Sequence, residues 1–175
     1  MSSIAPKSKD NSQEKVSKKR KLVLLAFLLF TLFIFACDFV SKFYLERFLL
    51  SIPSKHYVII PQVLDLTLAY NTGAAWSVLS KATQALGLFS LAVCGGLFAY
   101  VWHKASSLSY MQVFTFAAIA GGGLGNAYDR LARLAVVDFI DIQFFDFPIF
   151  NVADIAVSIG IFLLIISMFW DSYRN

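Results

Sequence analysis

The stretch IFNVADIAVSIGIFLLIISMFW, from Ile149 to Trp170, decides the fold of this chain, and its only ionisable side chain is Asp154. An apolar run of roughly 17 to 25 residues can cross a membrane as a helix. Three other uncharged stretches of similar length come before it. We therefore expect an α-helical integral membrane protein with four transmembrane helices, at residues 22–37 (continuing past Asp38 to about 45), 82–102, 108–128 and 149–170.

Composition agrees with a membrane protein, because 58% of the 175 residues are hydrophobic and only 15% are charged. Residues 22–175 are expected to form one membrane domain. The net charge of +4 arises in residues 1–21, which hold seven Lys and Arg against Asp10 and Glu14. A basic segment beside a hydrophobic helix marks the cytoplasmic side, so it does not indicate a nucleic-acid partner, and four spans place both termini in the cytoplasm. Residues 1–21 have few large apolar groups and are expected to be a disordered tail.

The segment after the first span has the pattern of β-structure. Leu64, Leu66, Leu68 and Tyr70 alternate with smaller or polar residues, and residues 57–60 are a second β-prone run. Alternation with a period of two is typical of a half-buried strand. We expect a small extracytoplasmic β-sheet between the first and second helices, within about residues 46–81, resting on the membrane surface.

Both cysteines, Cys37 and Cys94, fall inside predicted spans, so packing is favoured over a disulfide. One alternative is that residues before Cys37 are a cleavable lipoprotein signal peptide, since a basic region and an apolar run precede Ala36. Phe35 is bulky where such sites prefer small residues, and the apolar run continues beyond Cys37. Both points favour an uncleaved first helix.

Two aspartates, Asp138 and Asp154, stand in apolar sequence with no basic residue three or four positions away. A charge at membrane depth is costly and usually functional. Asn151, Asp154 and Ser158 are spaced to lie on one face of a helix. Two carboxylates around a bound water could act as general base and general acid, as in an aspartic hydrolase.

Other polar and small residues have a structural and a functional interpretation. Gly121 and Gly125 form a small-xxx-small pair that lets a neighbouring helix approach closely, and helix packing beside a charge cluster at Asp129 and Arg130 is the simpler interpretation. Asp38 and Lys42 stand four residues apart and can pair, which lowers the cost of burying each. Both interpretations of that pair remain open.

Four blocks carry a family resemblance: NTGAAWS (71–77), GGLGNAYDR (122–130), VVDFID (136–141) and FNVAD (150–154). In this order, with four spans around them, they resemble the signature blocks of lipoprotein signal peptidase, also called signal peptidase II. The resemblance covers roughly residues 22–170. It implies an intramembrane aspartic endopeptidase that removes the signal peptide of diacylglyceryl-modified prolipoproteins by cutting before the lipidated cysteine.

The resemblance also implies roles for individual residues. Asp138 and Asp154 match the catalytic dyad. Positions that shape the substrate site in the family correspond to Asn71, Gly73, Asn126, Arg130 and Asn151, and positions of polar support correspond to Asp38, Lys42 and Asp129. No cofactor and no metal are implied, the chain is expected to act as a monomer in contact with membrane lipid, and the location is the bacterial inner membrane with the active site near its outer face. Departures from the family pattern occur at Phe39, Trp76 and Leu134, where glutamine, phenylalanine and glycine are common.

Three other functions use the same residues differently. A transporter or channel could relay protons through Asp38, Asp138 and Asp154, but it predicts polar residues through the full membrane depth, and residues 159–170 are apolar apart from Ser167. A metal-dependent lipid headgroup transferase could use Asp129, Asp141 and the same pair, and would lose activity with a chelator. A structural assembly protein would tolerate Asp154→Asn.

Overall fold

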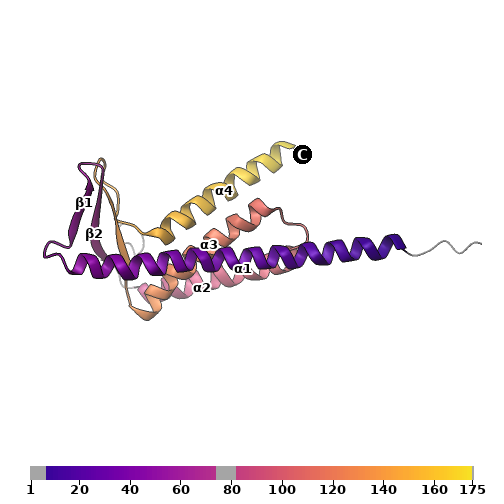
Figure 1. The fold of residues 1–175 in the computed structure, drawn as a ribbon, viewed down its shortest axis with the longest axis horizontal. Helices are drawn as coiled ribbons and strands as arrows, with labels where there is room; N and C mark the ends of the chain where they lie inside the picture. The colour runs from indigo at the N-terminus through magenta and orange to yellow at the C-terminus, as the bar shows by residue number, and fades with distance from the viewer. Residues whose placement is uncertain (1–6, 74–81, 175) are drawn as a thin grey trace, which may run out of the picture.

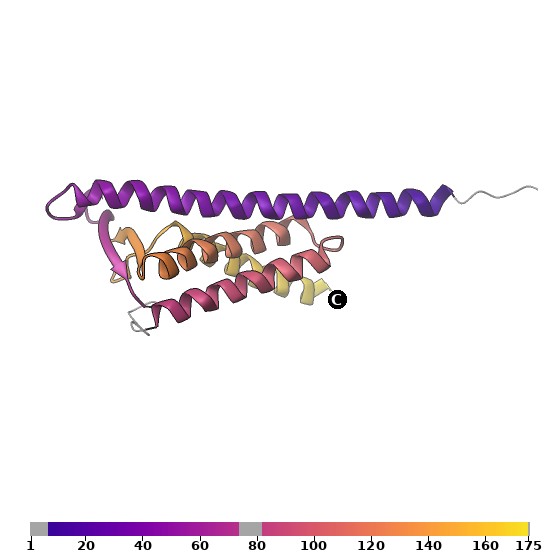
Figure 2. The same ribbon diagram turned by 90° about the horizontal axis from the view of Figure 1, so that it is seen from below.

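The computed structural model describes residues 7–73 and 82–174. Within these ranges the elements are α1 (Lys7–Leu50), β1 (His56–Ile60), β2 (Leu64–Asn71), α2 (Thr83–Lys104), α3 (Tyr110–Ala132), β3 (Val136–Ile142) and α4 (Val152–Arg174). The helices run alongside one another, and the strands gather at one end of the bundle (Figure 1). The start of α1 and the end of α4 both lie toward the other end (Figure 2).

Helix α3 occupies the middle of the bundle and contacts α1, α2 and α4. Its glycines make this possible. A Cβ at Gly121 would stand 2.7 Å from Cβ of Ile34 in α1, and one at Gly122 would collide with the carbonyl oxygen of Ala153 in α4. The close helix approach predicted from Gly121 and Gly125 is therefore confirmed, because both positions face α1 at a distance that only glycine permits.

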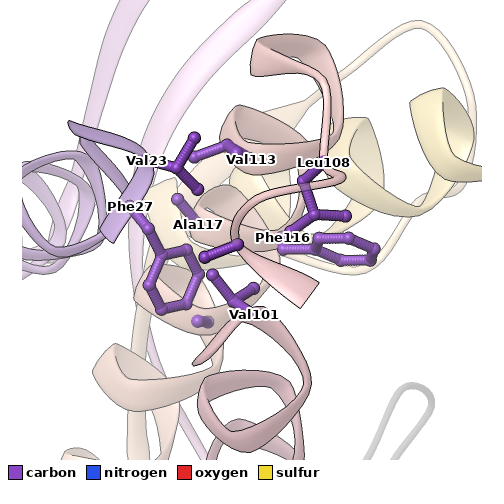
Figure 3. Close-up of a cluster of buried hydrophobic side chains, with 9 residues drawn as sticks. Val23, Phe27, Val101, Leu108, Val113, Phe116 and Ala117 are labelled. Carbon is purple, nitrogen blue, oxygen red and sulfur yellow. The ribbon is translucent and has the colours of Figure 1, made fainter. Parts of the chain in front are cut away.

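An entirely apolar cluster fills the bundle at the end away from the strands. Its buried members come from α1, α2, α3 and the α2–α3 turn: Val23, Phe27, Val101, Ala105, Leu108, Val113, Phe116, Ala117 and Ala120 (Figure 3). The rings of Phe27 and Phe98 meet edge to face, with centroids 4.9 Å apart. At the end of the bundle away from the strands, this cluster holds α1, α2 and α3 together without any buried charge.

Three helices of the described part of the chain are long and apolar enough to cross a membrane: Gln13–Leu50, Thr83–Lys104 and Val152–Phe169. The expectation of four such helices is confirmed only in part. Helix α3 carries Asn126, Asp129 and Arg130 near its end, which lowers its mean hydropathy. Because the other three helices cover it, α3 does not need an apolar surface of its own.

The sheet has three antiparallel strands in the order β1-β2-β3. Strands β1 and β2 lie where the alternating pattern predicts them. Strand β3, between α3 and α4, was not predicted, because its sequence VVDFIDI is short and does not alternate apolar with polar residues. In the sheet Asp138 pairs with Ala69, and Val137 pairs with Tyr70.

The prediction of a disordered tail is wrong for the part of it that the structure describes, because α1 begins at Lys7. Lys, Gln and Glu have high helix propensity and no proline lies between Pro6 and Pro53, so the apolar helix continues backward into the tail. The side chains from Gln13 to Leu22 are exposed. The tail is therefore helical but adds nothing to the core.

Candidate active site

The two aspartates reach the same region from different elements. Asp154 lies in the first turn of α4, as predicted. Asp138 lies on strand β3, outside the four predicted helices, and is only 2% exposed. The pairing of β3 with β2 carries Asp138 to the place where α4 begins.

Asn151 and Asp154 cap the start of α4 reciprocally. The Asn151 Oδ1 atom accepts the backbone N–H of Asp154 at 3.0 Å, and the Asp154 Oδ2 atom accepts the backbone N–H of Asn151 at 3.1 Å. This is the geometry of a capping box built from Asn and Asp. The cap holds the Asp154 carboxylate back against the helix start and leaves Oδ1 to accept from the Asn126 amide at 2.7 Å.

The same Asn151 side chain also reaches Asp138. Its Nδ2 atom donates to Asp138 Oδ1 at 2.6 Å and to Asn126 Oδ1 at 3.1 Å. Asn151 is completely buried, so these contacts fix its amide orientation. Asn151 is therefore a hydrogen-bonded bridge between the two aspartates.

Asn71 and Arg130 complete the side of the site that faces the end of β2. Asn71 Nδ2 donates to Asp138 Oδ2 at 3.2 Å, while its Oδ1 accepts the Gly73 N–H at 3.0 Å. Arg130 donates to the carbonyl of Gly73 at 3.3 Å and to that of Asn126 at 3.4 Å. Trp76, one of the departures from the family pattern, lies outside the described residues.

A buried ion cluster lies behind the site, formed by α1 and α3. The ammonium of Lys42 is 2.7 Å from Asp38 Oδ2 and 3.0 Å from Asp129 Oδ2. Lys42 is 3% exposed, and the two carboxylates are 0% and 3% exposed in their side chains. The pairing of Asp38 and Lys42 inferred from their spacing is confirmed, and Asp129 adds a second carboxylate to the same ammonium.

The surroundings of Asp138 change its protonation. Burial, and then the nearby carboxylate of Asp154, raise the pKa of Asp138 from 3.8 to about 7. Hydrogen bonds from Asn71 and Asn151 and the charge of Lys42 oppose the rise. A carboxyl with this pKa can hold a proton at neutral pH, which a general acid requires.

Two largely apolar cavities meet at Asp154, Arg130 and Ser158. One, of about 590 Å³, runs under the loop after β3 and is lined by Phe145, Phe147 and Pro148 among others. The other, of about 310 Å³, lies between α2, α3 and α4. The sequence analysis missed the loop residues, because exposed aromatic residues in a loop carry no periodic signal.

All ten residues selected from the sequence belong to one connected hydrogen-bonded and ionic network. It joins Asn71, Gly73, Asn126, Arg130 and Asn151 to the two aspartates and to the ion cluster. Leu134, the departure nearest β3, has a φ of 62°, in the left-handed region that glycine adopts most easily. That conformation accounts for a glycine being common at this position.

Comparison with known proteins points in one direction. The family model described as Signal peptidase (SPase) II matches residues 30–170, which contain the whole network. The lipoprotein signal peptidase of Pseudomonas syringae pv. tomato is 40% identical over 151 residues, covering 83% of this chain and 86% of that protein. The one from a Sulfurihydrogenibium species is 35% identical over 162 residues, covering 86% and 96%.

Solved structures give the same result. A structure described as a bacterial membrane enzyme superposes with a TM-score of 0.77 at 30% identity, covering 85% of this chain and 90% of that one. A second, with the same description, has a TM-score of 0.70 at 30% identity and covers 81% and 91%. The arrangement of helices and sheet is therefore that of a membrane enzyme.

Proposed function

This chain belongs to the signal peptidase II family, and from that premise we propose that it is an aspartic endopeptidase of the bacterial inner membrane that processes lipoproteins. Its substrates are diacylglyceryl-modified prolipoproteins, and it cleaves the peptide bond just before the lipidated cysteine. The observation that carries this proposal is the convergence of Asp138 and Asp154, brought from β3 and α4 and bridged by Asn151.

In the proposed mechanism the dyad holds one proton, carried by Asp138, and a water molecule lies between the carboxyls. Asp154 takes a proton from the water as its oxygen attacks the scissile carbonyl, while the Asp138 proton polarises that carbonyl. The tetrahedral intermediate then collapses. Its C–N bond breaks, and the proton held by Asp154 passes to the departing amine of the lipidated cysteine.

The cavities suit a substrate that is apolar on both sides of the scissile bond. The 590 Å³ and 310 Å³ cavities both open onto Asp154, so one could receive acyl chains and the other the signal peptide. Arg130 lines both cavities, and its buried Nε has no hydrogen-bond partner among the described residues. That donor is available for a carbonyl of the substrate.

The distribution of charge favours a peptidase over a proton-relaying transporter. The buried charged side chains of the described residues, Asp38, Lys42, Asp65, Asp129 and Asp138, all lie toward the sheet end, and the opposite end is the apolar cluster. A proton path across the membrane would need polar groups there as well. The proposal instead puts the site at one membrane surface, where water and a lipid-anchored peptide can meet.

The proposed topology has four membrane crossings, with the sheet on the outer face. Helix α3 packs along the three apolar helices, so it would cross with them. The basic tail and the end of α4 lie away from the sheet, which agrees with both termini in the cytoplasm (Figures 1 and 2). The chain would act as a monomer.

The direct test is cleavage of a diacylglyceryl-modified prolipoprotein by the purified protein. We expect Asp138→Asn and Asp154→Asn each to lower kcat by at least ~10²-fold, the scale for removing a general acid or base. Glu14→Gln, an exposed carboxylate in the tail, is the matched control and should retain full turnover. Folding is checked by circular dichroism in the same detergent.

Two outcomes would reject the proposal. If a folded dyad variant kept near-normal turnover, the aspartic mechanism would be wrong. If a chelator abolished turnover of the unmodified protein, a metal-dependent reaction at the same aspartates would replace it.

A further inference from the structure

Lys42 has three hydrogen-bond acceptors around its ammonium group, as many as it has N–H bonds. Two are the carboxylates of Asp38 at 2.7 Å and Asp129 at 3.0 Å, and the third is the Oδ1 atom of Asn126 at 3.0 Å. The ammonium group is 3% exposed. A buried ammonium is costly unless it is paired in this way.

The two carboxylates that accept from Lys42 also accept backbone N–H groups close to the dyad. Asp38 Oδ1 accepts the backbone N–H of Ala153 at 2.9 Å, and Asp129 Oδ2 accepts that of Val137 at 3.2 Å. Ala153 directly precedes Asp154, and Val137 directly precedes Asp138. Lys42 therefore joins the two carboxylates that hold the backbone just before each catalytic aspartate.

The third acceptor makes a still shorter connection. Lys42 and the amide of Asn151 both donate to the Oδ1 atom of Asn126, so the Nδ2 atom of that amide faces Asp154, to which it donates at 2.7 Å. Without the ammonium, only the donor from Asn151 would hold this orientation. Lys42 thus helps to orient the Asn126 amide that donates to the Asp154 carboxylate. It also places a positive charge behind that amide, with only Asn126 between the ammonium and Asp154.

We propose that Lys42 is a positioning residue for the dyad, setting the geometry and the shared proton of Asp138 and Asp154 through Asn126, Asp38 and Asp129. This inference rests on the proposed aspartic mechanism. It assigns Lys42 a role in the chemical step, beyond the structural pairing expected from its spacing with Asp38. Lys42 lines neither of the cavities that meet at Asp154, so the role concerns kcat rather than substrate binding.

The charged groups around the dyad determine the direction of the effect. They are Asp38 and Lys42 from α1, Asp129 and Arg130 from α3, Asp138 from β3 and Asp154 from α4. Lys42 and Arg130 are the cations of this set. The charge of Lys42 lowers the pKa of Asp138, so without that charge Asp138 keeps its proton to higher pH.

The test compares Lys42→Gln with Lys42→Arg in the full chain, with Lys104→Met as the control for loss of a lysine. Lys104 is exposed at the end of α2, far from the site in sequence and outside both cavities. For Lys42→Gln we expect kcat to fall about 10- to 100-fold, the scale of losing one well-placed donor. KM should stay within about twofold of its normal value. In the dependence of kcat on pH, the fall on the alkaline side should shift to higher pH by about one unit.

Lys42→Arg restores the charge and should return the alkaline limb to its normal position, even if kcat recovers only in part. If a folded Lys42→Gln variant kept the normal pH profile, or if Lys42→Arg showed the same displaced limb, the positioning role would be rejected in favour of packing alone. If Lys104→Met lowered kcat or displaced the alkaline limb in the same way, the positioning role would also be rejected.

A second pair of variants covers the case in which Lys42→Gln does not fold. Asn126→Ala leaves Lys42 its two carboxylates and should move the alkaline limb in the same direction. An alkaline limb that stays in its normal position in a folded Asn126→Ala variant would overturn the proposed path through Asn126.

An infrared titration of the carboxyl C=O band separates this inference from the proposed function, because it requires no turnover. The band that disappears in Asp138→Asn marks the dyad. In Lys42→Gln that band should persist to higher pH. If the unmodified protein fails to cleave prolipoproteins but the band moves as expected, the peptidase assignment is wrong and the positioning by Lys42 stands.

Discussion

Asn151 shows how one side chain can serve a helix and a reaction together. Its oxygen caps α4, and its nitrogen donates to Asp138 at 2.6 Å. A residue at position 151 with a capping oxygen but no side-chain N–H would keep the start of α4 and lose the hydrogen bond to Asp138. The two roles can therefore be separated by substitution.

Asn151→Asp keeps an oxygen for the cap and places a third carboxylate beside Asp138. We expect the helix content to stay normal while kcat falls about 10²-fold, since a donor is lost and a like charge is added. Asn151→Ala should lose the same activity and also about 1 kcal/mol of stability from the missing cap. Cleavage rates and thermal unfolding in detergent measure the two effects, and equal unfolding temperatures for the two variants would contradict the separation.

The raised pKa of Asp138 predicts the pH dependence of the reaction. Its value of about 7 lies above the ordinary 3.8, so the carboxyl keeps its proton up to neutral pH and loses it as pH rises through about 7. The general acid is then gone, and kcat should fall above that pH. The profile is measured at saturating substrate. A rate that stays flat to about pH 9 would be inconsistent with a protonated Asp138.

Strand β3 is the element on which the site depends most. It follows α3 after a tight turn at Leu134, whose φ of 62° is unfavourable for a residue with a Cβ. The turn lets the chain reverse from α3 into the sheet, so that Val137 meets Asp129 and Asp138 meets Asn151. The strain is local and does not disturb the strand that follows.

Replacing Leu134 with glycine should relieve this strain. We expect Leu134→Gly to stabilise the protein by up to about 1 kcal/mol. The substitution removes the cost of placing a Cβ in the left-handed region, but part of this gain is lost because glycine has more conformational freedom in the unfolded chain. Leu134 is exposed, so little packing is lost. The measurement is the unfolding temperature in detergent, with Ala132→Gly as the control, which should destabilise because Ala132 is helical. A lower unfolding temperature for Leu134→Gly would refute the assignment of strain.

At the scale of the whole molecule, charge and apolar surface are divided between the two ends. The ion cluster, the dyad and the sheet occupy one end, and the apolar cluster occupies the other. The tail continues α1 beyond the bundle (Figure 2). Near the start of the apolar span, the guanidinium of Arg20 lies 5.0 Å from the centre of the Trp102 ring on α2.

Deletion of residues 2–16 should leave both turnover and unfolding temperature nearly unchanged. The side chains from Gln13 to Val16 are exposed, and the first buried residue of α1 is Val23. Truncation is tolerated where no burial is lost. The shortened chain keeps Arg20 and the other basic residues from Lys18 to Lys21, so orientation in the membrane should be kept. A turnover loss beyond about threefold would show that the tail has a role in the site.

Local sequence patterns were sufficient to predict the helices, two of the strands and a set of candidate site residues. Apolar runs of membrane length and an alternating pattern are local properties, and an uncompensated carboxylate in such a run stands out without any structure. The family resemblance placed the dyad at Asp138 and Asp154. These inferences needed only neighbouring residues and the chemistry of the side chains.

Strand β3 and the single network formed by all ten residues became visible only in the folded chain. The hydrogen bond from the backbone N–H of Ala153 to Asp38 joins residues 115 positions apart in the sequence, and the one from Lys42 to Asn126 joins residues 84 positions apart. Such contacts depend on how the helices pack and on the pairing of β3 with β2, which no local pattern encodes. The role of Lys42 became visible for the same reason: its i,i+4 neighbour is Asp38, but its path to the dyad runs through α3.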